Sequence, residues 1–175
     1  RLLNTELFIV EGLSASNSVQ RVVDSAFQSV LGLQGKPMNT WNASQPKVLA
    51  NPQFSRLIQT LGNRIGDEFI LANCPFSSII LLFDPDADGI HGQCLLLWFF
   101  HRWMPPLLES GRILSASPNT IPNSKPIRGL ASIEAEHLRV TCIDPHTRST
   151  QTLSAEHALA RDRKSTRLNS SHLVI

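Results

Sequence analysis

Two short apolar runs, each followed by carboxylates, constrain the fold of this chain more than any other feature. The first run, "LFIV", precedes Glu11, and the second, "IILLF", precedes Asp84. A strand that is apolar at every position is buried on both faces, and such strands are typical of parallel sheets covered by helices on both sides. The two runs therefore predict an α/β fold in which acidic residues follow buried strands.

Helical patterns separate the expected strands, as they do in an open parallel sheet flanked by helices. The expected strands cover 6–10, 79–83 and 112–116. The expected helices cover 14–30, 52–62 and 90–104. The second of these helices starts at a proline and stops at a glycine, and the third is apolar on all sides, which indicates burial. Residues 40–52 are expected to form a polar loop.

The composition of the chain changes after the third expected strand. A proline-rich connector begins at residue 118, and the residues on both sides of "DPHT" alternate in polarity, which predicts a short β-hairpin. We therefore expect one domain at 1–117 and a connector with a hairpin extension at 118–160. Residues 161–175 resemble translated sequencing-adapter DNA and are expected to be a non-native or disordered tail. The chain begins with arginine instead of methionine, so we expect a piece of a longer protein.

Charge and composition narrow the classes of function. The last fifteen residues hold four basic residues against one acidic residue, so the formal charge of +2 leaves the preceding 160 residues at −1. A nearly neutral body does not bind nucleic acid by bulk charge alone. No apolar run approaches the roughly 20 residues of a membrane helix, and three cysteines without paired spacing favour a reducing, intracellular setting.

The acidic cluster at the end of the second run requires a cation. Asp84, Asp86 and Asp88 alternate along the chain, so an extended backbone points them to one face. Carboxylates that lie this close raise one another's pKa unless a cation neutralises them, and Mg²⁺ or Ca²⁺ prefers such oxygens. Glu11 follows the other buried strand, and parallel strands place their carboxyl ends on one edge. The sequence therefore predicts a divalent metal site formed by all four residues.

A calcium-binding EF-hand loop and a solvated acidic turn both fit this cluster less well. "DPDADG" matches the start of an EF-hand loop, but that loop needs a glutamate at its twelfth position, where this chain has Leu95, and a helix in front of it. A solvated acidic turn does not account for the cluster's place after a buried strand. In open α/β sheets, that place is where ligands bind.

A resemblance to a known family rests on these motifs. "ELFIVEG" followed by "SA", together with "IILLFDPDADGIH" and "LLLWFFHRWMPPLLESGRI", resembles the TOPRIM domain of the B subunit of bacterial type II DNA topoisomerases, DNA gyrase and topoisomerase IV. "LGLQGKPMN" and "LIQTLGNRIGDEF" resemble two further stretches of that family. The resemblance runs from about residue 6 to residue 117 and implies a TOPRIM-like open parallel sheet.

The resemblance also implies roles for single residues. Glu11 would be a metal ligand and the general acid for the 3′ oxygen, and Asp84, Asp86 and Asp88 would bind one or two Mg²⁺ ions beside the scissile phosphate. The metal would neutralise developing charge and align the reacting oxygens.

Three further positions match residues that approach DNA in that family. These positions are Lys36, Asn39 and His91. For Lys36, a phosphate contact and an ordinary surface lysine remain equal alternatives. Asn39 also suits a turn, and His91 also suits the start of a helix.

The implied partners are DNA and a second polypeptide. The chain contains no tyrosine, so the tyrosine nucleophile of this family would belong to an A subunit. ATP would bind in a region outside this fragment, because nothing here resembles a P-loop. The resemblance further implies a homodimer of the full-length protein, a cytoplasmic location and no membrane association.

Departures from the family pattern lead to competing functions. The family has an acid where this chain has Leu13, and basic residues where it has Gln34 and Gln93; lost basic residues remove phosphate contacts. The first hypothesis is the cleavage site of an ATP-hydrolysing type II topoisomerase. The second is a catalytically weakened B-subunit paralogue that acts as a DNA-docking or assembly module. The third, a stand-alone TOPRIM nuclease or primase-like enzyme, is disfavoured by the long helix at 90–104.

Overall fold

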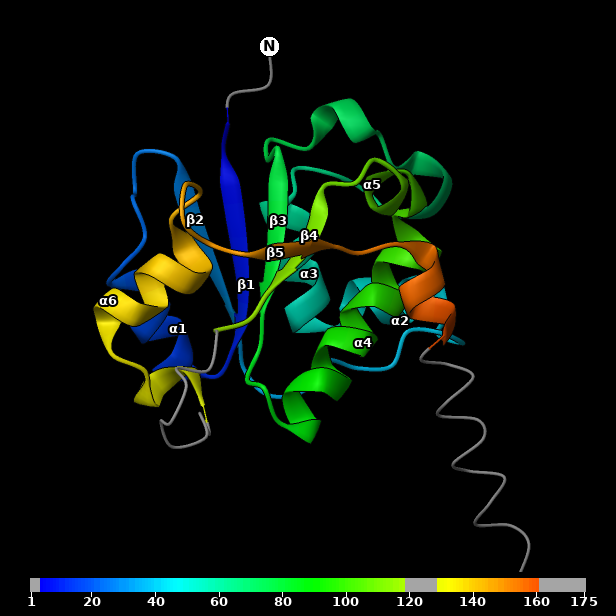
Figure 1. Ribbon diagram of the computed structural model, residues 1–175. Helices are drawn as coiled ribbons and strands as arrows, with labels where there is room; N and C mark the ends of the chain where they lie inside the picture. Colours follow the sequence, from blue (N-terminus) through cyan, green and yellow to red (C-terminus); the bar gives the residue numbers. More distant parts are fainter. Residues whose placement is uncertain (1–3, 119–128, 161–175) are drawn as a thin grey trace, which may run out of the picture.

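The protein is built on one five-stranded sheet. A computed structural model describes residues 4–118 and 129–160, and its strands follow the order β2-β1-β3-β4-β5 (Figure 1). The strands are β1 (Glu6–Glu11), β2 (Gln28–Leu33), β3 (Ser78–Leu82), β4 (Ile113–Ala116) and β5 (Thr150–Thr152). Strands β1 to β4 pair in parallel with one another, and β5 runs antiparallel to β4. The predicted α/β class, a largely parallel sheet flanked by helices, is confirmed.

Helices cover both faces of the sheet. They are α1 (Leu13–Gln20), α2 (Gln45–Ala50), α3 (Pro52–Thr60), α4 (Ala87–Trp103), α5 (Pro105–Glu109) and α6 (Ala135–Leu138), which continues as a π-helical turn (Arg139–Ile143). Three short 3₁₀ turns lie at Gly66–Glu68, Leu71–Asn73 and Leu130–Ser132. One core cluster packs the helices α2, α3, α4 and α5 against one face of the sheet. The other packs α1, α6 and the π-helical turn against the opposite face.

The central strands β1 and β3 supply side chains to both clusters. Leu7 and Ile9 lie in the first cluster, whereas Phe8 and Val10 lie in the second. Successive side chains of a strand point to opposite faces, so a strand between two helical layers is apolar at every position. This burial explains why the strands expected at 6–10, 79–83 and 112–116 are found to within one residue.

The helix expected at 90–104 is α4, and it is the most buried helix of the fold. Its residues from Cys94 to Phe100 are all buried. Phe99 stacks on Phe54 of α3, with 4.6 Å between ring centroids, and contacts Phe100 edge-on at 5.5 Å. The all-round apolar pattern therefore reflects packing against the sheet, α3 and α5 together.

The helix expected at 14–30 is too long. It ends at Gln20, and Gln28–Leu33 forms β2, which pairs in parallel with β1. Asp24 makes the turn between them, because its side chain accepts a hydrogen bond from the Ala26 amide at 2.9 Å and its carbonyl accepts one from Gln28 at 2.8 Å. Val22, Val23 and Val30, whose spacing suggested a helix, instead pack against the core cluster on one face of the sheet. The pairing of β2 with β1 outweighs the local propensity for a helix.

The polar loop expected at 40–52 contains the short helix α2. Ser44 caps it by accepting a hydrogen bond from the Lys47 amide at 3.4 Å. Helix α3 begins at Pro52 as expected, with the Asn51 side chain accepting hydrogen bonds from the amides of Gln53 and Phe54. Each of these two consecutive helices therefore begins with a side-chain cap and a proline in its first turn.

The β-hairpin expected around "DPHT" is wrong. Only its second arm is a strand, β5, while the first arm is α6 with its π-helical turn. The buried residues Leu138 and Cys142 are four apart, which suits a helix packed on the sheet. The rest of the connector, residues 119–128, and the tail predicted at 161–175 lie outside the described residues.

Within 4–118 and 129–160, none of the helices has the length and apolar character needed to cross a membrane. The three cysteines, Cys74, Cys94 and Cys142, are buried and are not joined in disulfides.

Candidate metal centre at the carboxyl edge of the sheet

Strands β1 and β3 bring the acidic residues to one edge of the sheet. Val10 pairs with Leu82 in parallel register, so Glu11 and Asp84 follow the paired strands side by side. Helix α1 leaves β1 over one face, and α4 follows β3 over the other. In open α/β sheets, the carboxyl ends of strands at which the helices diverge to opposite faces are the usual ligand site.

Glu11 lies in the electrostatic field of all three aspartates. Partial burial raises the pKa of its carboxyl group first, and the negative charges of Asp84, Asp86 and Asp88 raise it further. The ammonium group of Lys36 acts in the opposite direction. Repulsion of this kind acts over short distances, so Glu11 lies near the three aspartates.

Asp84 is held by a residue from the far end of the chain. Its Oδ1 atom accepts a hydrogen bond from the backbone amide of Leu130 at 2.8 Å. Leu130 begins the 3₁₀ turn that follows the undescribed connector. The sequence pattern did not predict this contact, because the two residues are 46 positions apart.

Asp86 and Asp88 are each engaged by a different group. Asp86 caps α4, with its Oδ1 accepting a hydrogen bond from the Gly89 amide at 2.7 Å. Asp88 pairs with Lys36, whose Nζ lies 3.0 Å from its Oδ1, and both side chains are exposed at the surface. Lys36 therefore lies in the acidic site, where it supplies a positive charge.

The side chains fit a hard divalent cation in charge and in donor type, but they do not form a closed ligand set. Among the described residues, no group of three or more His, Cys, Asp and Glu side chains is arranged to hold a metal ion. Asp84, Asp86 and Asp88 point to Leu130, Gly89 and Lys36 respectively. Carboxylate oxygens are the donors that Mg²⁺ prefers.

A small hollow gives access to Asp84. It has a volume of about 210 Å³ and lies between the ends of β3 and β4. Its polar lining consists of Asp84, Gln93, Ser115, Ser117 and Gln151. The carboxylate of Asp84 can therefore be reached from outside the protein.

Two glycines of α4 allow the helix to approach the acidic residues. A Cβ atom on Gly89 would lie 1.9 Å from the carbonyl oxygen of Asp84. A Cβ atom on Gly92 would lie 3.1 Å from Oε2 of Glu11 and 3.0 Å from the ring of Phe83. The site therefore depends on close packing that only glycine permits at position 89.

Among the described residues, neither of the other two expected DNA contacts, Asn39 and His91, forms a hydrogen bond or an ion pair with the carboxylates. Asn39 forms a turn, with its Oδ1 accepting a hydrogen bond from the Trp41 amide at 2.9 Å, and a turn is a common role of asparagine. His91 is exposed on the second turn of α4. Leu13, which replaces an acid of the family pattern, is 67% exposed at the start of α1.

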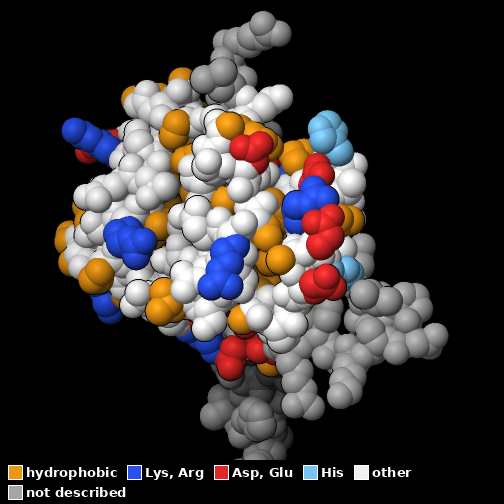
Figure 2. All heavy atoms as spheres, turned by 90° about the vertical axis from the view of Figure 1, so that its left-hand side faces the viewer, with side chains coloured by type: hydrophobic (Ala, Val, Ile, Leu, Met, Phe, Trp, Pro, Cys, Tyr) orange, Lys and Arg blue, Asp and Glu red, His pale blue; other side chains and the backbone are white. Residues whose placement is uncertain are grey.

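Charges of both signs are interspersed on the face that carries β2, α1 and α6. Among the described side chains in Figure 2, the basic groups on this face are separated from one another, and several lie next to acidic groups. Arg139, for example, pairs with Glu136 and Asp144. Isolated basic groups attract a phosphate backbone less than a continuous basic stripe does.

The raised pKa of Glu11 leads to a prediction on stability. A carboxyl group whose pKa is higher in the folded state destabilises the fold above that pKa and has no effect below the pKa of the unfolded chain. Glu11→Gln is therefore expected to raise Tm at pH 7 in the absence of divalent ions. The gain should shrink as the pH falls through the folded pKa towards about 4.5, the ordinary value.

Differential scanning calorimetry in a metal chelator, at several pH values, measures this effect. Glu109→Gln, in the last turn of α5, is the matched control and should leave Tm unchanged. A lower Tm for Glu11→Gln at pH 7 would show that the carboxylate is stabilised by its surroundings, contrary to this prediction.

Comparison with known proteins gives the family. Residues 6–117 match the Toprim domain. The B subunit of DNA topoisomerase 4 from Enterococcus faecalis is 33% identical over 194 aligned residues, which cover 93% of this chain and 28% of that protein. The B subunit of DNA gyrase from Thermotoga maritima is 44% identical over 114 residues, covering 65% of this chain and 18% of that protein.

The similarity continues past the Toprim match. The B subunit of DNA gyrase from Haloferax volcanii is 32% identical over 188 residues, covering 91% of this chain and 29% of that protein. A match of this extent includes α6 and β5. The chain spans less than a third of the length of these curated relatives. With the sheet, the acidic edge and these matches taken together, the chain belongs to the Toprim domain family and is similar to the B subunits of DNA gyrase and topoisomerase IV.

Proposed function

We propose that this chain supplies the Mg²⁺-binding Toprim site of a type II DNA topoisomerase, as a fragment of its B subunit, which cleaves and religates double-stranded DNA together with a tyrosine-bearing A subunit. The observation that supports this function is that Glu11, at the end of β1, lies in the electrostatic field of Asp84, Asp86 and Asp88, which follow the neighbouring strand β3. We further propose that 1–117 is the Toprim unit and that 118–160 is an extension docked on it.

The residues of the site divide the chemistry between them. Mg²⁺, when bound, would neutralise charge that develops on the scissile phosphate and align its oxygens. Asp84, Asp86 and Asp88 would hold the metal, with Glu11 as a further ligand. Glu11 would also act as the general acid for the 3′ oxygen. Lys36 would exchange Asp88 for a DNA phosphate, and Asn39 and His91 would lie along the same strand.

The remaining components would come from outside this chain. The nucleophile would be a tyrosine of the A subunit, because the chain has none. ATP binding and hydrolysis would belong to another region of the full-length protein, which would form a homodimer. We also propose a cytoplasmic location.

Metal binding tests this function directly. Isothermal titration with Mg²⁺ should give a saturable signal that disappears in the Asp84→Ala/Asp86→Ala double variant. The free energy of unfolding should rise by about 2.7 kcal/mol when free Mg²⁺ is about 100 times Kd. The matched control is Asp67→Ala/Glu109→Ala, two exposed acidic residues outside the site, which should bind like the parent chain. Absence of Mg²⁺ binding to the parent chain would remove the catalytic function.

A second candidate function has its own support. The exposed Leu13 and the separated basic groups of Figure 2 favour a catalytically weakened paralogue that acts as a DNA-docking or assembly module. Relaxation of supercoiled DNA by the full-length protein and an A subunit distinguishes the two. Activity that Glu11→Ala abolishes supports the enzyme, whereas DNA binding without relaxation supports the module.

A further inference from the structure

A buried ion pair lies at the edge of the sheet opposite the acidic site. Arg148 donates two hydrogen bonds to the carboxylate of Glu6, at 2.5 and 2.7 Å, and both side chains are only 9% exposed. Glu6 begins β1, and Arg148 lies two residues before the start of β5. Two parallel hydrogen bonds fix the relative orientation of the groups as well as their distance, so the pair ties the C-terminal segment to the first strand.

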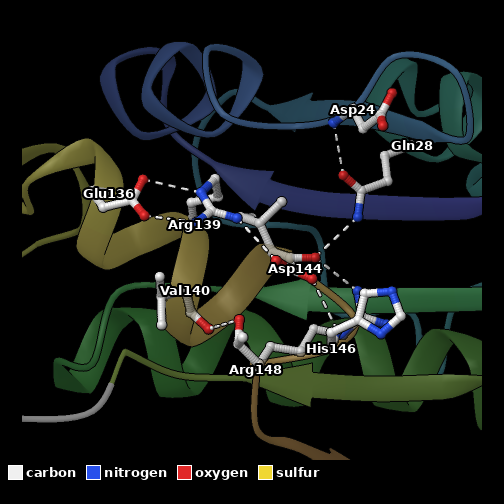
Figure 3. A network of polar contacts seen from close by, with 10 residues as sticks. Asp24, Gln28, Glu136, Arg139, Val140, Asp144, His146 and Arg148 are labelled. Atoms are coloured by element: carbon white, nitrogen blue, oxygen red, sulfur yellow. Dashed lines mark hydrogen bonds and ion pairs between the residues drawn. The ribbon is translucent and has the colours of Figure 1, made fainter.

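Gln28 completes the polar contacts of this pair. Its Nε2 donates to Oε2 of Glu6 at 2.8 Å and to the carbonyl oxygen of Ile143 at 3.0 Å. Its Oε1 accepts a hydrogen bond from the Asp24 amide at 2.8 Å, as Figure 3 shows. Arg148 also donates to the Ile143 carbonyl at 3.0 Å. We call Glu6, Gln28, Arg148 and the Ile143 carbonyl the docking network.

A turn aims Arg148 at this network. Asp144 accepts hydrogen bonds from the amide of His146 through its side chain and from the amide of Arg148 through its carbonyl, both at 2.9 Å. Arg139 lies between Glu136 and Asp144 in Figure 3 and pairs with both. The hydrogen bond from the His146 amide lowers the pKa of Asp144 most, and the hydrogen bond and positive charge of Arg139 lower it further. The carboxylate thus stays charged and keeps the turn closed.

The same segment reaches the acidic site at its other end. Between the two ends, Leu138 and Cys142 are buried in the core cluster shared with α1. At the start of the segment, the Leu130 amide donates to Asp84. Residues 130–148 are therefore held at both edges of the sheet, by the docking network at one edge and by Asp84 at the other.

We propose that Glu6, Gln28 and Arg148 are positioning residues for the metal site: they hold the C-terminal segment so that the Leu130 amide fixes the direction of the Asp84 carboxylate. The proposal rests on the proposed function in so far as Asp84 is a metal ligand. Loss of Arg148 would leave the charge of Glu6 buried without a counter-ion, which drives the segment away from the sheet. The Leu130 amide would then leave Asp84, whose carboxylate would rotate freely. Partners that orient a metal ligand affect metal affinity although they do not touch the metal.

Three variants test the proposal. Arg148→Met removes the positive charge. Arg148→Lys keeps the charge but cannot make the two parallel hydrogen bonds to the Glu6 carboxylate. Phe54→Leu is the control, because Phe54 lies in the other core cluster and its truncation lowers stability without touching the segment. Hydrogen exchange of the Leu130 amide, relative to the amides of β1, measures the contact with Asp84. Titration calorimetry measures the Kd for Mg²⁺.

The expected results separate positioning from general stability. Arg148→Met should speed exchange at Leu130 and raise the Kd for Mg²⁺, each by about tenfold, and Arg148→Lys should do both to a smaller extent. Phe54→Leu should lower Tm with neither effect. Unchanged exchange at Leu130 in Arg148→Met overturns the proposal; if that variant does not fold, the same result in Arg148→Lys does so.

The exchange measurement also distinguishes failure of the positioning role from failure of the proposed function. If the parent chain binds no Mg²⁺, the proposed function fails. Exchange at Leu130 then still decides whether the docking network holds this amide on Asp84.

Discussion

Gly89→Ala is expected to lower the free energy of unfolding by about 3 kcal/mol, the upper range for overpacking a close contact. The added Cβ atom would lie 1.9 Å from the carbonyl oxygen of Asp84 and 2.8 Å from its carbonyl carbon. Both atoms belong to the backbone, so no side-chain rotation relieves the clash. Either the first turn of α4 or the loop that carries Asp84 must move. Urea unfolding followed by circular dichroism measures the loss.

The neighbouring glycine of α4 provides the control. In Gly92→Ala the nearest atoms belong to the side chains of Phe83 and Glu11, at 3.0 and 3.1 Å, and they can yield by a few tenths of an ångström. Alanine also gains about 1 kcal/mol of helix propensity over glycine. Gly92→Ala should therefore cost far less than Gly89→Ala. Equal losses in the two variants would mean that the contact between α4 and Asp84 is not close.

Phe99→Ala is expected to cost about 3–5 kcal/mol, as is usual when a fully buried aromatic residue is truncated. Phe99 has no exposed surface and packs between Phe54 and Phe100. Its removal leaves a cavity between α4 and α3 that neither rigid helix can close. A loss of this size is a large part of the total stability of a small domain.

Two further variants check the assignment of this loss to packing. Phe99→Leu fills part of the cavity and should cost clearly less than Phe99→Ala. Leu49→Ala, at a site that is 46% exposed, should change stability by less than about 0.5 kcal/mol. A loss below about 1 kcal/mol for Phe99→Ala would show that the interface between α3 and α4 can collapse to refill the space.

Local sequence signals succeeded where local structure and burial agree. Strands β1 and β3 were predicted because a run that is apolar at every residue suits a strand between two helical layers. Helix α3 was predicted from Pro52 at its start and a glycine at its end. The prediction for 14–30 failed because Val30 and its neighbours suit a helix and a strand equally well, and the free edge of β1 decided for a strand.

The arm of the false hairpin failed for a related reason. Residues around Cys142 alternate in polarity over a few positions, which suits a strand, but burial of Leu138 and Cys142 follows a helical spacing. A stretch this short satisfies both periods. The helix forms because it covers the part of the sheet face that α1 leaves uncovered. The local sequence of the stretch carries no information about that distant surface.

The candidate site was predicted in composition but not in detail. The alternation predicted that an extended backbone points Asp84, Asp86 and Asp88 to one face, and this is wrong, because Asp86 caps α4 and Asp88 lies in its first turn. The order of the parallel strands did predict that Glu11 lies near them. Their hydrogen-bond partners could not be foreseen, since Leu130 is 46 residues from Asp84 and Arg148 is 142 residues from Glu6. Whether the four carboxylates bind Mg²⁺ stays a prediction.

The sequence by itself determined the central parallel strands, the edge at which the acidic residues gather and the buried character of α4, because each follows from a period or a residue type along a few neighbouring positions. Only the tertiary structure decided that 28–33 is a strand, that α6 covers the sheet and that the two ends of the C-terminal segment meet Glu6 and Asp84. These features depend on contacts between distant parts of the chain, and such contacts leave no period in the local sequence.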